Sequence, residues 1–144
     1  MSMRSLVGHR GAGVVAAAAV VLSACGPGEP SSVTLGLCDD IPGAIVEMER
    51  MRDSLEDGNF AANVTGVVTH THDLLQPMFE DARRAVASED FEPYEQVGAY
   101  VRGSWLAYVE MDTVDFRPGY LSYTESIRRL RLAEQACDDL DEHV

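Results

Sequence analysis

Two of the three cysteines, Cys38 and Cys137, are residues whose type and spacing can do covalent chemistry. A cysteine pair forms a disulfide in an oxidising compartment, whereas two free thiols are the expectation inside the cell. Because the sequence has no Cys-x-x-Cys motif, the predicted Cys38–Cys137 bridge is structural rather than redox-active. In the chain-entropy model, closing a loop of this size stabilises a fold by about 4–5 kcal/mol.

His70 and His72, together with Asp73, come nearest to a metal-ligand group. Residues two apart on a helix do not face the same way, and the apolar pattern places both histidines away from the buried seam. Pairs of the form Glu-x-x-His, which hold iron in carboxylate bundles, do not occur in the sequence. We therefore predict solvated histidines, with no metal site and no cofactor.

The carboxylates mostly fit solvent-facing sides of helices. General acid–base catalysis needs a carboxyl group whose pKa is raised inside a cleft, and nothing in the sequence locates such a cleft. Glu134 is the exception, because it falls in register with an apolar stripe one turn before Cys137. Its side chain either reaches solvent at the end of the fold or is a buried acid with a shifted pKa. We predict no catalytic residue and no enzymatic activity.

The basic side chains gather most closely at Arg128, Arg129 and Arg131. We expect these arginines to pair with acidic neighbours and with the negative end of their own helix. The alternative is that they dock an acidic partner or an anionic head group.

The N-terminal segment has a start with Arg4 and Arg10, an apolar run over residues 11–22, and the stretch Leu22-Ser23-Ala24-Cys25-Gly26. The apolar run is too short to span a bilayer, which needs about 20 apolar residues. The segment has the charged start, apolar middle and small-residue exit of a secretory signal. It resembles the signal peptide and lipobox of bacterial lipoproteins over residues 1–26.

This resemblance implies cleavage before Cys25 and a diacylglycerol thioether on its sulfur. Two acyl chains suffice for stable anchoring, so the expected location is the extracytoplasmic side of the cell membrane. We predict that residues 1–24 are removed and that residues 25–37, rich in Gly, Pro and Ser, form the lipidated cysteine and a flexible linker. The alternatives are an ordinary signal peptide, in which Cys25 is incidental, and an N-terminal membrane helix.

The composition is strongly acidic, with 24 Asp and Glu residues against 11 basic residues, all of them arginine. The predicted leader carries two of the arginines and no acidic residue, so the remaining chain has a net charge of −15. This charge argues against nucleic acid as a partner and against electrostatic adhesion to anionic lipid. It is compatible with a solvated surface outside the cell.

Apolar residues recur with a helical period from Cys38 onward. In the first predicted helix they form one stripe, made of Ile41, Ala44, Ile45, Met48, Met51 and Leu55. The pattern predicts helices over residues 42–57 and 59–87, and a last helix from a turn at Arg117-Pro118-Gly119 to Asp139. Between them, a third helix is expected to begin after Ser88-Glu89-Asp90, which should cap it, with Pro93 in its first turn. Pro77 is expected to kink the second helix or to divide it in two.

The number of helices is tied to the cysteine pair. Cys38 lies at the start of the first helix and Cys137 at the end of the last. An even number of antiparallel helices brings these two ends to the same pole, as a disulfide requires, whereas three helices separate them by a helix length. The sequence therefore predicts an all-α fold, an up-down four-helix bundle over residues 38–144 closed by one disulfide.

The third helix is apolar on two faces. One face, with Tyr94, Trp105 and Tyr108, is expected to join aromatic residues of the fourth helix. This aromatic group either is plain core or lines a ligand pocket between the two helices, and its members are Tyr94, Trp105, Tyr108, Tyr120 and Tyr123. The second face either is core or meets a partner outside the bundle, and its members are Ala99, Tyr100, Gly103, Leu106 and Ala107.

These features predict a cellular location and a fold, but no specific activity. The function that they favour is a non-enzymatic, lipid-anchored module that binds another envelope protein. The alternative is a carrier of a small or lipid-like molecule in an aromatic-lined cavity between helices.

Overall fold

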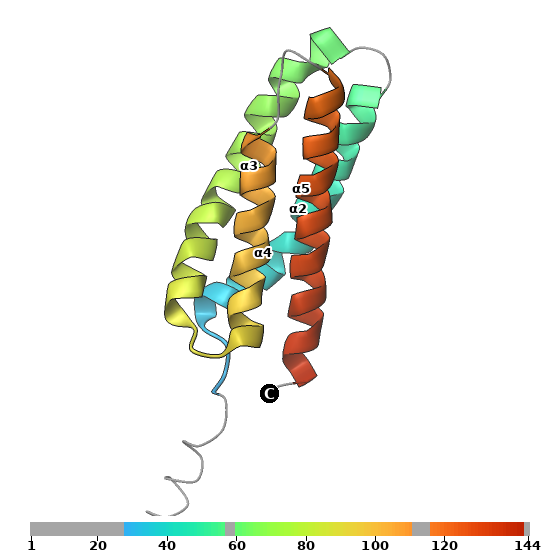
Figure 1. The fold of residues 1–144 in the computed structure, drawn as a ribbon. Helices are drawn as coiled ribbons and strands as arrows, with labels where there is room; N and C mark the ends of the chain where they lie inside the picture. The colour runs from blue at the N-terminus through green and yellow to red at the C-terminus, as the bar shows by residue number, and fades with distance from the viewer. Residues whose placement is uncertain (1–27, 57–59, 111–115, 143–144) are drawn as a thin grey trace, which may run out of the picture. The chain divides into compact units, whose positions relative to one another are not determined.

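In the computed structural model, which describes residues 28–56, 60–110 and 116–142, four α-helices follow one another along the chain (Figure 1). They are α2 (Ser32–Glu56), α3 (Phe60–Ser88), α4 (Glu92–Val109) and α5 (Phe116–Asp139), and the short 3-10 helix η1 (Leu140–Glu142) follows α5. The described residues contain no strand, so the predicted all-α class is confirmed. Over the same residues, no helix has the length and apolar character needed to cross a membrane.

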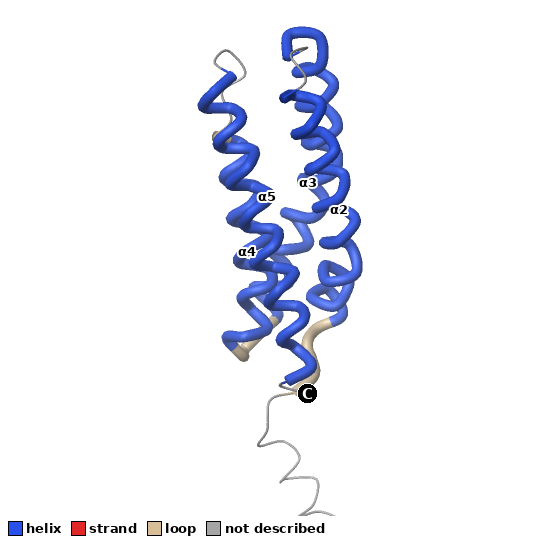
Figure 2. The backbone as a smooth tube through the Cα atoms, turned by 90° about the vertical axis from the view of Figure 1, so that its right-hand side faces the viewer, coloured by secondary structure: helices blue, strands red, loops and turns tan. Residues whose placement is uncertain are grey.

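The helices form an up-down-up-down bundle, in which successive helices run in opposite directions (Figures 1 and 2). Each helix packs against the next one in the chain, and α5 returns to pack against α2. The diagonal pair α2 and α4 has little contact by comparison. The predicted four-helix bundle is therefore confirmed.

Each helix contributes one apolar stripe to the core. Every residue of the stripe predicted for the first helix is buried: Ile41, Ala44, Ile45, Met48, Met51 and Leu55. The largest fully buried side chains of the other three helices include Leu75, Tyr94, Val97, Val101, Tyr123, Ile127 and Leu130. Removing such apolar side chains from water supplies most of the free energy of folding.

The predicted disulfide joins α2 to α5. The Cα atoms of Cys38 and Cys137 are 5.6 Å apart, and their sulfur atoms are bonded. Both cysteines are partly buried against the core. The bond closes a segment with a sequence separation of 99 residues, so it fastens the beginning of the bundle to its end.

The first helix begins earlier than predicted. The flexible linker expected up to residue 37 is wrong from Ser32 onward, because α2 already includes this stretch. Thr34 and Leu37 are fully buried there, and burial of these side chains stabilises the additional helical residues. Pro42, expected in the first turn, lies inside the helix.

The beginning of α2 is held by residues that were expected to cap the third helix. Glu89 accepts hydrogen bonds from the backbone N–H of Ser31 and from the hydroxyl of Thr34, both at 2.7 Å. A carboxylate at this position also interacts favourably with the positive end of the helix dipole. The residue before α4 is Phe91, which makes no side-chain capping hydrogen bond, so the predicted role of Ser88-Glu89-Asp90 as its cap is wrong.

The structure also bears on two predictions about prolines, at Pro118 and at Pro77. The turn expected at Arg117-Pro118-Gly119 is wrong, since α5 already begins at Phe116. Proline is tolerated in a first helical turn because the N–H groups there have no partner within the helix. The helix α3 is continuous through Pro77, which excludes its division into two helices.

Candidate functional site

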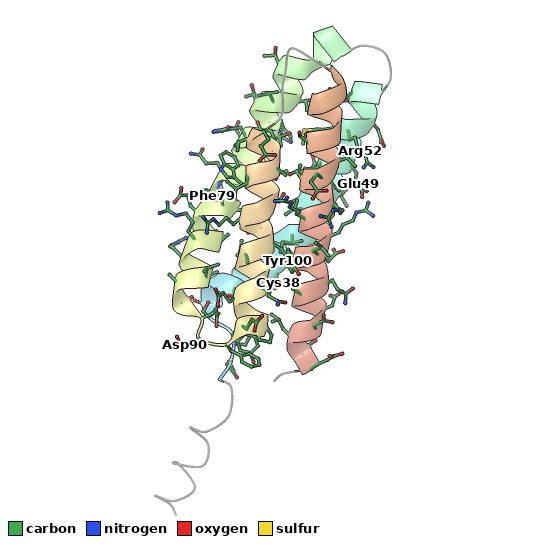
Figure 3. All side chains as sticks on the ribbon, in the orientation of Figure 1. Cys38, Glu49, Arg52, Phe79, Asp90 and Tyr100 are labelled. Atoms are coloured by element: carbon green, nitrogen blue, oxygen red, sulfur yellow. A yellow bond between two sulfur atoms is a disulfide. The ribbon has the colours of Figure 1, made fainter. Side chains whose placement is uncertain are left out.

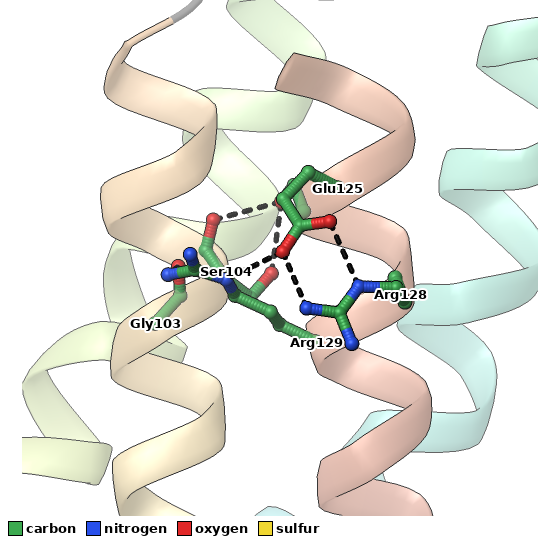
Figure 4. Close-up of polar contacts among 6 residues, drawn as sticks. Gly103, Ser104, Glu125, Arg128 and Arg129 are labelled. Carbon is green, nitrogen blue, oxygen red and sulfur yellow. Dashed lines mark hydrogen bonds and ion pairs between the residues drawn. The ribbon is translucent and has the colours of Figure 1, made fainter. Parts of the chain in front are cut away.

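Two arginines of α5, Arg128 and Arg129, are organised around one carboxylate, Glu125 (Figure 4). Arg128 donates from Nε and Nη2 to the two carboxylate oxygens of Glu125, at 2.8 and 2.6 Å. Arg129 donates from Nε to the Oε1 atom of the same carboxylate at 3.1 Å, and from Nη1 to the backbone oxygen of Gly103 in α4 at 3.0 Å. Arg129 therefore links α5 to α4, whereas Arg128 stays on its own helix.

Small residues let α4 and α5 approach each other at this point. Ser126 donates to the backbone oxygen of Ser104 at 2.8 Å, and the two hydroxyl oxygens lie 2.9 Å apart in the buried interface. A Cβ atom at Gly103 would lie 3.2 Å from Cδ of Arg129, which is a tight contact. Gly103 thus leaves room for the Arg129 side chain to cross α4.

The ion pairs shift the pKa values of Glu125, Arg128 and Glu47. Hydrogen bonds from Arg128 and Arg129 lower the pKa of Glu125 to about 2, and the same carboxylate raises the pKa of Arg128. On α2, the hydrogen bond from Arg50 lowers the pKa of Glu47. These groups are held in their charged forms, as paired surface ions are.

The third arginine of the group, Arg131, pairs with Glu49 of α2. Glu49 and Arg52 project from α2 beside α5 (Figure 3). Between the two helices lies a surface hollow of about 330 Å³, lined by Arg52, Thr124, Ile127, Arg128 and Arg131. Three arginines from two helices therefore border one depression.

Two members of this lining have unused hydrogen-bonding capacity. The hydroxyl oxygen of Thr124 is buried and has no hydrogen-bond partner among the described residues. Arg52 forms no ion pair with any residue in the described ranges. Neither residue was identified from the sequence. Arg52 lies about one turn after Glu49 on α2, and the packing of α2 against α5 places it beside the α5 arginines.

The residues predicted to line an aromatic pocket are brought together only in part: Trp105 lies against Tyr108, whereas Tyr94 lies apart from both. Tyr94 is fully buried and packs edge-on against Phe91, with ring centroids 4.8 Å apart. Trp105 lies 11 residues further along α4, about 16 Å away along the axis. Its ring stacks on Phe79 at 5.5 Å and also lies 5.5 Å from the ring of Tyr108.

The other two members of the predicted pocket belong to α5. Tyr123 is fully buried, and its hydroxyl group lies 3.0 Å from that of Thr71. The side chain of Tyr120 is outside the described part of the structure. Tyr108 donates from its hydroxyl group to the backbone oxygen of Val68 at 2.9 Å. The described aromatic side chains thus fill space between helices.

The predicted partner face of α4 divides into covered and open positions. Ala107 is buried, Tyr100 packs against the core, and Gly103 is covered by Arg129. Leu106 is exposed over 43% of its surface. Ala99 is exposed as well, and it borders a second hollow of about 460 Å³ whose other lining residues are Glu92, Glu95 and Gln96.

The other predicted residues lie as follows. His70 and His72 are exposed; Nε2 of His70 lies 3.4 Å from a carboxylate oxygen of Glu47, and the ring of His72 lies edge-on to Trp105. Within the described ranges, no three potential ligands gather into a metal site. Glu134 is partly exposed. Cys25, the predicted lipidation residue, lies outside the described residues.

Comparisons with protein-family models, with curated proteins and with solved structures found no match to this chain.

Proposed function

We propose that this protein is a lipid-anchored, extracytoplasmic module of the bacterial cell envelope that acts by binding rather than by catalysis. The observation that carries the proposal is the bond between Cys38 and Cys137. Structural disulfides form and persist in oxidising compartments, outside the cytoplasm. The lipobox-like stretch around Cys25 is consistent with export to such a compartment, and acylation of Cys25 would anchor the bundle to the membrane.

The acidic groups support binding over acid–base catalysis. A general acid at neutral pH needs a raised pKa. Among the described residues, the two carboxyl groups with shifted pKa values are Glu47 and Glu125, and arginine neighbours lower both pKa values. They serve as permanent anions in ion pairs.

The surface supports contact with another envelope protein. Large apolar side chains are exposed on α4, where Leu106 and Val109 are 43% and 51% exposed, and on α2, where Val46 is 63% exposed. The alternative of an internal carrier has less support, because Tyr94 and Tyr123 are fully buried core residues and Trp105 is stacked against Phe79. A protein-interaction or accessory role is therefore the function that we propose.

The anchoring part is tested by expressing the full chain in a bacterium that processes lipoproteins. We expect intact-mass and peptide analysis of the membrane fraction to find a chain that starts at an acylated Cys25. The variant Cys25→Ser should move to the soluble fraction. The control variant Ser54→Ala, a similarly small substitution within the bundle, should stay in the membrane fraction. An uncut leader, or a Cys25→Ser variant that stays in the membrane fraction, would contradict the proposal.

The binding part is tested by site-specific photo-cross-linking on intact cells. A cross-linking residue at position 106, on the exposed apolar part of α4, should capture one envelope protein. The same residue at position 83, an exposed arginine of α3, serves as the control and should not capture it. Equal capture from both positions, or none from position 106, would speak against a partner on α4.

A further inference from the structure

We propose that the hollow between α2 and α5, lined by Arg52, Arg128 and Arg131, binds a phosphate group. The ligand is either a small soluble phosphate compound or the phosphate of a lipid headgroup, since both offer the same oxyanion. This proposal does not depend on the proposed anchoring or on a protein partner at α4.

The argument begins with the donors around the hollow. A guanidinium group has five N–H donors in a planar fork and no acceptor. Arg128 uses its Nε and Nη2 atoms for Glu125, and Arg131 uses Nη2 for Glu49. Arg52 has no ion-pair partner among the residues described. The three arginines that line the hollow therefore keep N–H groups for an incoming anion.

The fixed charges leave the lining positive. Glu49 and Glu125 offset two of the three positive charges on Arg52, Arg128 and Arg131, and Arg129 adds a further positive charge beside Glu125. The whole chain has a net charge of −13. Because salt screens interactions beyond about 8 Å, these nearby charges act on a bound anion more strongly than distant charges do.

The neutral part of the lining also suits a phosphate ligand. The buried hydroxyl group of Thr124 has no partner among the described residues, and a buried polar group without a partner is costly. A phosphate oxygen would accept a hydrogen bond from it. Ile127 supplies apolar surface for the rest of the ligand. The volume of about 330 Å³ is at the small end for ligand sites, which favours a small phosphate compound or a single headgroup.

Phosphate and carboxylate differ in the directions from which their oxygens accept hydrogen bonds. A carboxylate is satisfied by one bidentate arginine, as Glu125 is by Arg128. A phosphate group has oxygens that point in several directions and can accept from guanidinium groups on two helices together. Arg52 from α2 and Arg128 and Arg131 from α5 offer such an arrangement.

The test titrates the full chain, with its disulfide oxidised, with inorganic pyrophosphate at constant ionic strength and follows binding by calorimetry. A second arm measures co-sedimentation with vesicles of phosphatidylglycerol against vesicles of phosphatidylcholine. We expect saturable binding in at least one arm, and that arm identifies the source of the phosphate. Binding to neither probe would overturn the proposal.

Matched variants locate the site. Arg52→Gln should weaken the binding at least tenfold, because charge-assisted hydrogen bonds are lost. Arg102→Gln removes the same charge from an exposed position on α4 and should change the affinity less than twofold. Thr124→Val removes the unpartnered hydroxyl without changing charge, and it should weaken binding without lowering the thermal midpoint. Equal losses in Arg52→Gln and Arg102→Gln, or unchanged binding in Arg52→Gln, would overturn the proposal.

Discussion

The hydroxyl groups of Thr71 in α3 and Tyr123 in α5 lie 3.0 Å apart inside the bundle, where both residues are fully buried. Thr71 also donates to the sulfur of Met51 in α2, at 3.6 Å, so its oxygen is left to accept from the phenol of Tyr123. Burial raises the pKa of Tyr123, which keeps the phenol protonated as a donor. Through these two polar contacts, Thr71 joins three helices within an apolar core.

Replacing Tyr123 with phenylalanine removes this donor and keeps the ring. We expect Tyr123→Phe to lower the free energy of unfolding by about 1–2 kcal/mol, since the buried Thr71 oxygen loses a partner. Urea unfolding measures the change. A double-mutant cycle with Thr71→Val should give a coupling energy of about 1 kcal/mol, and full additivity of the two variants would show that the hydroxyl groups do not interact.

The disulfide is expected to contribute more than any single polar contact. In the chain-entropy model, removing a bridge across a loop of about 100 residues costs about 4.7 kcal/mol. The double variant Cys38→Ser/Cys137→Ser should show this loss in urea unfolding, relative to the oxidised protein. The reduced wild-type chain is the control and should resemble the double variant. A loss below about 1 kcal/mol would contradict the view that the bond stabilises the bundle.

Two helical glycines should respond in opposite directions to the same substitution. A Cβ atom at the buried Gly98 would lie 2.8 Å from the backbone oxygen of Ala82 and 2.9 Å from Cγ2 of Val86. We expect Gly98→Ala to destabilise the fold by about 1–3 kcal/mol, because α3 and α4 must move apart. At the exposed Gly43, the same Cβ atom would meet no atom within 4 Å apart from its own stretch of helix backbone. Gly43→Ala should stabilise α2 by about 0.5–1 kcal/mol through helix propensity. Similar shifts in thermal midpoint for both variants would contradict this packing.

Aspartate substitutions at the two alanines of the predicted partner face should have different effects on stability. Ala107 is 3% exposed, so Ala107→Asp buries an unpaired charge and should cost about 3–5 kcal/mol. Ala99 is exposed, and Ala99→Asp should change stability by no more than about 0.5 kcal/mol. Circular dichroism during thermal unfolding distinguishes the two. A fold that tolerates aspartate at 107 would place that residue on an open surface.

The ion pairs of Glu125 predict a specific pH dependence. Its pKa falls from the ordinary value of 4.5 to about 2 in the folded protein, so the unfolded chain binds the proton more readily between these values. The stabilisation is therefore complete above about pH 4.5 and is lost as the pH falls toward 2. Because the carboxylate is solvent-accessible, the effect should not exceed about 1 kcal/mol.

Stability measured from pH 6 to pH 2 in the wild type and in Glu125→Gln tests this dependence. The difference between the two proteins should shrink as the pH is lowered. Glu80→Gln, on the exposed face of α3, is the matched control. A constant difference across the range would show that the titration of Glu125 is not coupled to folding.

Much of the fold followed from local patterns. The helical period of apolar residues predicted the α2 stripe, and the positions of Cys38 and Cys137 indicated an even number of helices. The errors concern helix beginnings. Residues 32–37 have the composition of a linker, and their helical state depends on Glu89, which is remote in sequence, and on burial of Leu37. A signal that depends on a distant residue is not present in the local sequence.

The candidate site was found only in part. Arg128, Arg129 and Arg131 were identified as a group, and their expected pairing with acidic neighbours is confirmed by Glu125 and Glu49. Arg52 and Thr124 were not identified, because neither stands out within its own helix. The aromatic pocket was predicted from residues that share a helical face, although Tyr94 and Trp105 are separated along the axis of α4.

The sequence by itself determined the helical class, the pairing of Cys38 with Cys137 and the buried face of α2. These properties follow from the 3.6-residue period and the order of residues along the chain. The tertiary structure alone decided that Arg52 lies beside Arg128 and Arg131, that Glu89 holds the start of α2, and that Thr71 meets Tyr123. Such contacts depend on the rotation and axial register of one helix against another, which are set by packing of the whole core.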